Sequence, residues 1–146
     1  MVALLSTSAQ DRPELATSID DLEASIAALG TPPAELPVRH IFDVPGLYAR
    51  QIFMPAGTLV TSKIHKTKHM FVVSAGEMLV WSEKGGAEHI CAPFTGITEP
   101  GTRRAIYVVQ DTIWTCFHVT DKKNVDEIEE DVILKHTNPL LTKGDS

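Results

Sequence analysis

A series of short strand-like segments between residues 39 and 120 constrains the fold more than any other feature of this sequence. The segments are rich in β-branched and aromatic side chains, and Gly or Pro stands between most of them. No helical periodicity separates them, so the pattern predicts an antiparallel β-sandwich or β-barrel. The candidate strands are residues 47–54, 58–64, 68–74, 77–82, 87–92, 104–110 and 112–119.

Short helices are predicted on both sides of this strand region. In residues 1–38, apolar residues recur at helical spacing, and Gly30 provides a stop after them. In residues 121–146, Asn124 is a suitable N-cap for a second short helix. We therefore expect one domain, a barrel at residues 39–120, flanked by two arms that each carry a short helix and an irregular stretch.

Composition and charge exclude several classes of protein. A 146-residue chain that is 43% hydrophobic is expected to form one packed core. The net charge of −6 argues against nucleic-acid or anionic-membrane partners, which require a basic face. Cys91 and Cys116 lie in apolar strand-like runs without a CxxC pair, so we expect reduced core cysteines. With neither a long apolar stretch nor a secretory signal, the expected location is the cytoplasm of the producing cell.

One polar stretch inside the strand region carries the residues best suited to chemistry. Lys63, His65, Thr67 and His69 alternate along the chain and would share one side of an extended strand. In a straight strand, His65 and His69 would lie ~13 Å apart. They can share one metal ion only if the chain turns between them, and the polar sequence HKTK is a suitable place for a turn.

The spacing of this stretch resembles the first motif of the cupin family. That motif runs Gly, five residues, His, one residue, His, three or four residues, Glu, six residues and Gly. Here Gly57, Lys63, His65, His69 and Gly76 stand at the five positions with the spacing kept. Lys63 replaces the first histidine ligand and His69 replaces the glutamate, so His65 alone matches a ligand of this motif by type.

The second cupin motif, Pro-x-Gly-x-x-His, is also similar to a stretch of this sequence. Pro100 and Gly101 are adjacent, so the proline is displaced by one residue, and Arg104 occupies the histidine position. The likeness covers roughly residues 42–120 and implies a cupin-type antiparallel β-barrel, or jelly roll. Because cations replace two ligands, it implies no established cupin catalysis, and no catalytic residue is assigned.

The wider sequence is similar to small single-domain cupins of tailed bacteriophages and prophages. The likeness rests on the segments IFMPAG, IHKT and PGTRR and on the C-terminal DEIE. It implies a phage or prophage setting, with the protein acting in assembly and becoming a component of the virion. The terminal arms would then contact other copies of the chain or other virion proteins.

Two kinds of ligand remain open for the polar cluster. A divalent metal ion would use His65 and His69, with His118 as a third ligand from the face that also carries Cys116. Alternatively, Lys63 and Arg104 would hold a small anion such as a carboxylate or phosphate. The two interpretations conflict, because cations beside a metal ion must be neutralised or turned away.

Three functional hypotheses follow. The leading one is a non-catalytic cupin barrel for assembly or binding, phage-encoded and a structural component of the virion, with homo-oligomers or virion proteins as partners. The alternative is a metal-dependent small-molecule enzyme, resembling cupin isomerases or dioxygenases, with a site rearranged around His65, His69 and His118. The third is a sensor of a small anionic metabolite, bound through Lys63 and Arg104.

Overall fold

The computed structural model describes residues 2–5, 19–30, 35–136 and 138–142 of the chain. Within these residues the fold is dominated by antiparallel β-structure, which confirms the all-β prediction. The strands are β1 (Val2–Leu5), β2 (Val38–Val44), β3 (Leu47–Met54), β4 (Thr58–Thr61), β5 (Ile64–His65), β6 (His69–Ser82), β7 (Gly86–Cys91), β8 (Phe94–Thr98), β9 (Arg104–Val119) and β10 (Ile133–Leu134). The helices are α1 (Ile19–Ala28), α2 (Val125–Val132) and α3 (Pro139–Thr142).

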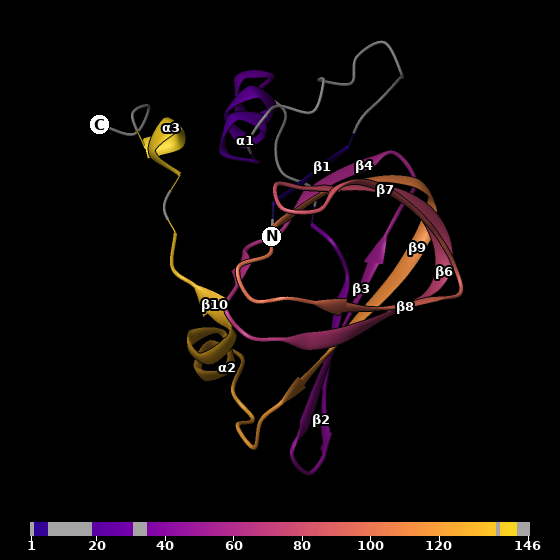
Figure 1. Cartoon of the computed structure of the whole chain (residues 1–146), viewed down its shortest axis with the longest axis vertical. Helices are drawn as coiled ribbons and strands as arrows, with labels where there is room; N and C mark the ends of the chain where they lie inside the picture. Colours follow the sequence, from indigo (N-terminus) through magenta and orange to yellow (C-terminus); the bar gives the residue numbers. More distant parts are fainter. Residues whose placement is uncertain (1, 6–18, 31–34, 137, 143–146) are drawn as a thin grey trace.

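Two long strands organise the sheet. β9 pairs with β3, β4 and β6, while β6 also pairs with β7 and β8. With β1 beside β4 and β2 beside β3, these strands form one 8-stranded sheet. Register shifts between Val73 and Met78 let β6 bend, so the sheet curls around an interior (Figure 1). The strand pairing among the described residues does not close into a continuous ring. β5 and β10 form a separate 2-stranded sheet beside it.

The strand prediction assumed that Gly76 marks a turn, but the structure has no turn there. The segments 68–74 and 77–82 form one continuous strand, β6, with Gly76 inside it at φ +105°. A Cβ atom at this position would lie 2.2 Å from Thr112 Oγ1 and 2.5 Å from Thr112 Cα. The glycine therefore lets β6 approach β9 closely at the bend.

Other strand predictions also differ from the structure. Segments 104–110 and 112–119 join into the single strand β9, because the chain passes residue 111 without a turn. Segment 58–64 is divided between β4 and β5, and β1, β2, β8 and β10 were not predicted. β8 contains Gly96, where a Cβ would lie 2.5 Å from the ring of Phe71, so this glycine serves close packing rather than a turn.

Both helix predictions are confirmed, and each helix covers apolar surface of the sheet. α1 buries Ile19, Leu22 and Ile26 in a cluster with Leu59 and Ala105. This contact provides the hydrophobic stabilisation that so short a helix lacks by itself.

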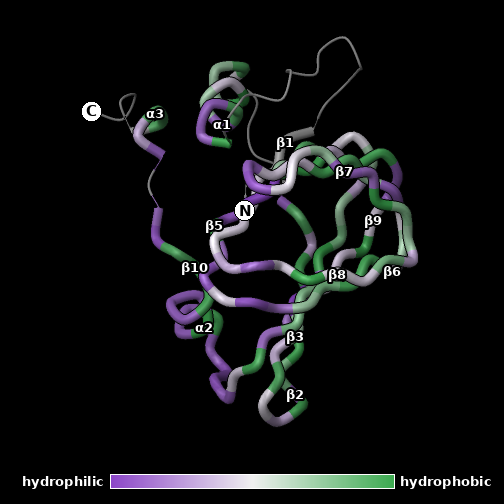
Figure 2. Tube along the Cα trace, viewed as in Figure 1, coloured by the Kyte–Doolittle hydropathy of each residue, from purple (hydrophilic) through white to green (hydrophobic). Residues whose placement is uncertain are grey.

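α2 covers another part of the sheet. It buries Ile128 and Val132 beside Tyr48, although most of its surface is hydrophilic (Figure 2). The Asn124 side chain caps it by accepting hydrogen bonds from the backbone N–H groups of Asp126 and Glu127. The main core lies inside the curled sheet and includes Ile52, Met54, Val60, Phe71, Val73, Met78, Val80, Ile90, Ile106, Val108 and Trp114.

The described parts of the two arms contact each other. α3 lies beside α1 (Figure 1), and Asn138 Nδ2 donates hydrogen bonds to the Asp20 backbone oxygen and to Glu23 Oε1. His136 Nε2 lies 3.0 Å from Asp20 Oδ1. Contacts of the arms with other subunits stay a prediction. No helix within the described ranges is long and apolar enough to cross a membrane.

Candidate metal and ligand site

A cavity of about 50 Å³ lies between the inner face of the sheet and α2. Strands β3, β5, β6 and β9 and the connection between β4 and β5 contribute its polar side chains, and α2 covers one side. The mixture of a few polar groups with apolar walls is found in small-molecule sites. A volume of about 50 Å³ admits only an ion or a molecule of a few atoms without movement of the walls. The polar and sulfur-containing residues that line it are Tyr48, Arg50, Met54, Ser62, Lys63, His65, His69, Arg104, Cys116, His118 and Glu129.

The structure brings the three histidines predicted as metal ligands together at this cavity. His65 ends β5, His69 begins β6, and His118 lies near the end of β9. The chain bends at Thr67, as a shared site requires, and the rings of His65 and His69 have centroids 4.8 Å apart. The ring of His118 lies 4.3 Å from that of His69 and 6.4 Å from that of His65.

One nitrogen of each ring is buried without a hydrogen-bond partner. These atoms are His65 Nδ1, His69 Nε2 and His118 Nδ1. Leaving a buried polar atom unpaired costs about 1–3 kcal/mol, and native proteins do so rarely. Three such atoms around one cavity form a candidate set of donors for a metal ion or another ligand.

The imidazoles are held in the neutral form that coordinates metal ions. Burial lowers the pKa of His65 to about 3, helped by the charges of His69, His118 and Arg104. Burial also lowers the pKa of His118 to about 4, with His69 and Arg50 contributing. The pKa of His69 is lowered as well, mainly by burial. Protons therefore do not compete with a cation near neutral pH.

Arg104, predicted as an anion ligand, reaches into the same cavity. Its guanidinium lies over the rings of Phe71 and Trp114, 5.0 and 5.6 Å from their centroids, and donates a hydrogen bond to Thr98 Oγ1. Among the described residues, no carboxylate lies within 4.0 Å of it. Burial lowers the pKa of Arg104, as expected for a charge that lacks a close counter-ion.

Lys63, the second predicted anion ligand, is placed differently. It lies at the cavity wall, but its Nζ is 3.6 Å from Glu129 Oε2 of α2, and half of its side chain is exposed. Its charge is thus directed toward α2. One of the two cations that opposed a metal site is therefore neutralised.

Sequence reasoning missed Arg50 and Tyr48, which also line the cavity. Both belong to β3, where Tyr48, Arg50, Ile52 and Met54 all face the site. The period of two in this strand was a usable signal. It was overlooked because neither Tyr48 nor Arg50 stands at a motif position of the resemblance.

The other three histidines make local contacts. His40 Nδ1 lies 2.6 Å from the Tyr48 hydroxyl, and His136 contacts Asp20. His89 contacts Glu77 rather than its sequence neighbour Glu88.

The cysteine prediction is half wrong. Cys116 lines the cavity and accepts a hydrogen bond from Trp114 Nε1 at 3.1 Å. Cys91 is exposed instead of buried, because its neighbour Ile90 takes the inward position on β7.

Comparison with known proteins supports the fold. No protein-family model and no curated protein matches the chain. Ectoine synthase from P. lautus is similar in structure, with a TM-score of 0.53 and 14% identity, over 70% of this chain and 78% of that chain. Protein NMB1881 from Neisseria meningitidis has a TM-score of 0.50 and 10% identity, over 65% of this chain and 95% of that one.

A third similar structure is described by its fold. It is an RmlC-like cupin family protein with a double-stranded β-helix fold from Methanocaldococcus jannaschii. Its TM-score is 0.50 at 10% identity, over 60% of this chain and 82% of that one. The chain therefore has a cupin fold. Identities this low establish the fold alone, and a phage origin stays a prediction.

Proposed function

We propose that this protein is a metal-dependent enzyme acting on a small anionic molecule, with the metal ion and the anionic group held side by side in the cavity. One observation carries the proposal: three histidine nitrogens are buried around one cavity without hydrogen-bond partners. Of the hypotheses raised by the sequence, this is the enzyme with a rearranged histidine site. Ectoine synthase, an enzyme by name, has a similar fold and makes such a role compatible with the architecture.

The donor set fits a divalent transition metal. Neutral imidazole suits Zn²⁺, Fe²⁺ and Ni²⁺, and three protein ligands leave positions for another molecule. Nitrogen–metal distances of about 2.0–2.1 Å allow two nitrogens to lie no more than ~4.2 Å apart. In the structure these three histidines do not bring one nitrogen each within 4.8 Å of one another. The rings of His65 and His118, with centroids 6.4 Å apart, would have to turn toward each other. Bound metal would supply a Lewis acid that polarises an oxygen of the substrate.

Arg104 gives the substrate its charge specificity. Its planar guanidinium can bind a carboxylate through two parallel hydrogen bonds, and its aromatic neighbours Phe71 and Trp114 hold it in place. A cation without a close counter-ion costs free energy in a partly buried site. An anionic ligand would remove that cost, whereas Lys63 is already paired with Glu129.

Elemental analysis of untagged protein tests the metal. We expect His65→Ala and His69→Ala each to hold about one metal ion per chain fewer than the wild type, and His136→Ala to hold as many as the wild type. The histidine in this control contacts Asp20. A wild type that holds no metal after incubation with Zn²⁺, Fe²⁺, Mn²⁺ or Ni²⁺, or cavity variants that both hold as much metal as the wild type, would contradict the proposal.

Thermal stabilisation by small carboxylates tests the anion site. Ligands that raise the melting temperature should lose their effect in Arg104→Ala, while Lys63→Ala should retain most of it. The uncharged amides of the same acids should have no effect. Equal losses in the two variants would mean that general charge attraction, and not a built site, binds the acids.

A further inference from the structure

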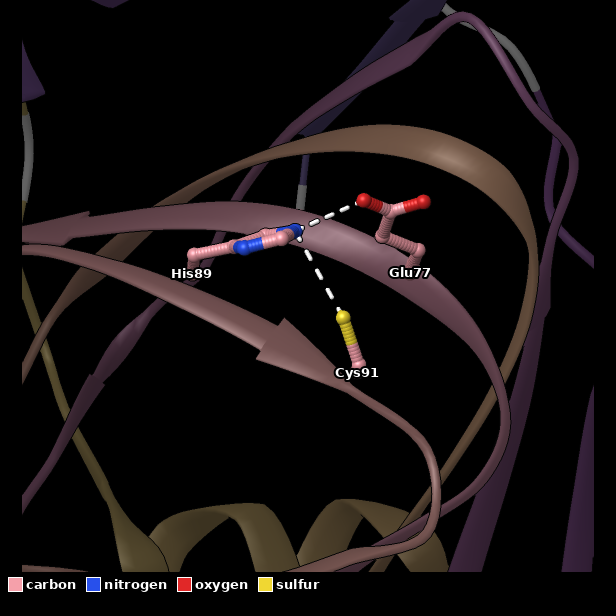
Figure 3. A group of neighbouring side chains, drawn as sticks. All are labelled: Glu77, His89 and Cys91. Carbon is pink, nitrogen blue, oxygen red and sulfur yellow. Dashed lines mark hydrogen bonds and ion pairs between the residues drawn. The ribbon is translucent and has the colours of Figure 1, made fainter.

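A second group of potential metal ligands lies outside the cavity, on the β6–β7 hairpin. Glu77 of β6 pairs directly with Cys91 of β7, and His89 lies two residues before Cys91 on the same face of the strand. Their neighbours Met78 and Ile90 pair with each other and are buried in the core. Because side chains alternate along a strand, Glu77, His89 and Cys91 therefore project from the outer face (Figure 3).

The ligand atoms of these three residues converge. His89 Nε2 lies 2.7 Å from Glu77 Oε2 and 3.5 Å from Cys91 Sγ. All three atoms lie within 4.8 Å of one another, and among the described residues no other group of three His, Cys, Asp or Glu meets this spacing. Figure 3 shows both contacts meeting at the same ring nitrogen.

Sharing of this nitrogen argues against a catalytic relay. In a Cys–His–acid triad, the thiol and the carboxylate contact opposite nitrogens of the ring. Here Nε2 contacts both partners, although it carries either one proton or one lone pair. If it carries a proton for Glu77, it has no lone pair for the Cys91 thiol. If it is unprotonated, it cannot donate to the carboxylate.

A single cation would satisfy all three groups at once. We propose that Glu77, His89 and Cys91 form a surface site for a thiophilic divalent ion of the Zn²⁺ type. Thiolate and imidazole exclude Mg²⁺ and Ca²⁺, which take oxygen ligands, and are usual ligands of zinc. The fourth position of a tetrahedral ion would face solvent, because His89 and Cys91 are exposed.

The hairpin needs little adjustment to accept the ion. Tetrahedral zinc places its nitrogen and sulfur ligands ~3.6 Å apart, close to the 3.5 Å between His89 Nε2 and Cys91 Sγ. Nitrogen and oxygen ligands lie ~3.4 Å apart around zinc, so the 2.7 Å hydrogen bond to Glu77 must open by ~0.7 Å. A small rotation of the Glu77 side chain provides this without moving the strands.

Metal bound at this site would stabilise the edge strand β7 of the sheet. Within the described residues, β7 pairs with β6 alone, so its other edge is unpaired. Metal bound to Glu77 of β6 and to two residues of β7 would join the strands through side chains as well as through the backbone ladder. Residues 86–91 should then exchange their amide hydrogens more slowly when the ion is bound.

Titration of the untagged, metal-free protein with Co²⁺ tests the site. Cobalt bound to thiolate gives a sulfur-to-metal charge-transfer absorption that cobalt bound to imidazole and carboxylate does not give. We expect one equivalent of this absorption in the wild type and its loss in Cys91→Ser. Zn²⁺ should displace the cobalt and abolish the absorption.

Matched variants identify the ligands and separate this site from the cavity. Cys116→Ser and His118→Leu should retain the absorption, since both residues belong to the cavity. His89→Ala should lose it, and Glu77→Gln should require more cobalt to reach it. Glu88→Gln, on the same hairpin, should leave the titration unchanged. Absorption that is absent from the folded wild type, or that survives in Cys91→Ser, would overturn the proposal.

Discussion

Replacement of His118 by leucine provides a quantitative test of the idea that the cavity is built for binding at a cost in stability. His118 is 5% exposed and, among the described residues, makes ring contacts but no hydrogen bond. Removing its unpaired nitrogen should recover about 1–3 kcal/mol. Losing its ring contacts with Tyr48 and His69 should cost about 0.5–1.5 kcal/mol. The metal-free His118→Leu protein should therefore be more stable than the wild type by about 1 kcal/mol.

Urea unfolding in the presence of a chelator measures this difference. A gain of that size raises the melting temperature by about 2–4 °C in a chain of this length. His40→Leu is the control, because it removes the 2.6 Å hydrogen bond to the Tyr48 hydroxyl and should lose about 0.5–1.5 kcal/mol. With saturating metal the wild type should be more stable than His118→Leu, since the metal ion stabilises only the protein that retains the His118 ligand.

The pH dependence of the same comparison follows from the pKa of His118. Its pKa is about 4 in the folded protein and about 6.5 when unfolded, so the unfolded state binds more protons between these values. Wild-type stability thus falls as the pH drops below about 6.5. His118→Leu has no imidazole at this position to protonate, so the excess of its free energy of unfolding over that of the wild type should grow toward pH 4. A destabilised His118→Leu protein in chelator, or an advantage that stays constant with pH, would refute the reasoning.

Three further results are expected. Gly76→Ala should lower the free energy of unfolding in urea by about 3 kcal/mol or more, because its Cβ would meet the Thr112 backbone at 2.5 Å in a strained conformation. Gly86→Ala has open space around the added Cβ and should lower it by only about 1–2 kcal/mol. Equal losses would contradict the close-packing role of Gly76. Asn124→Ala should lower thermal stability by about 1 kcal/mol through loss of the α2 cap, and an unchanged melting temperature would contradict that role. Size-exclusion chromatography with light scattering tests the assembly hypothesis: it predicts an oligomer, and a monomer with protease-sensitive arms would count against it.

The sequence by itself determined the class of fold and much of the candidate site. Alternating β-branched residues and regularly placed glycines are local features, and they predicted an all-β chain with short helices at both ends. The spacing from Gly57 to Gly76 singled out His65 and His69, and strand alternation added His118. The fold class and the choice of His118 depend on side-chain periodicity, which neighbouring residues impose without reference to the rest of the chain. The choice of His65 and His69 depends also on the likeness of their spacing to the first cupin motif.

Only the tertiary structure decided how these residues are used. Gly76 read as a turn until the approach of β6 to β9 showed why a side chain is excluded there. Lys63 matched a ligand position, but an ion pair with Glu129 of α2 offsets its charge.

Cys91 read as a core residue for a similar reason. The register of β6 and β7 turns it outward and places it beside a carboxylate far away in the sequence. Sheet register and helix docking are set by which apolar faces can be buried together, and that choice involves residues too distant for any local pattern to specify.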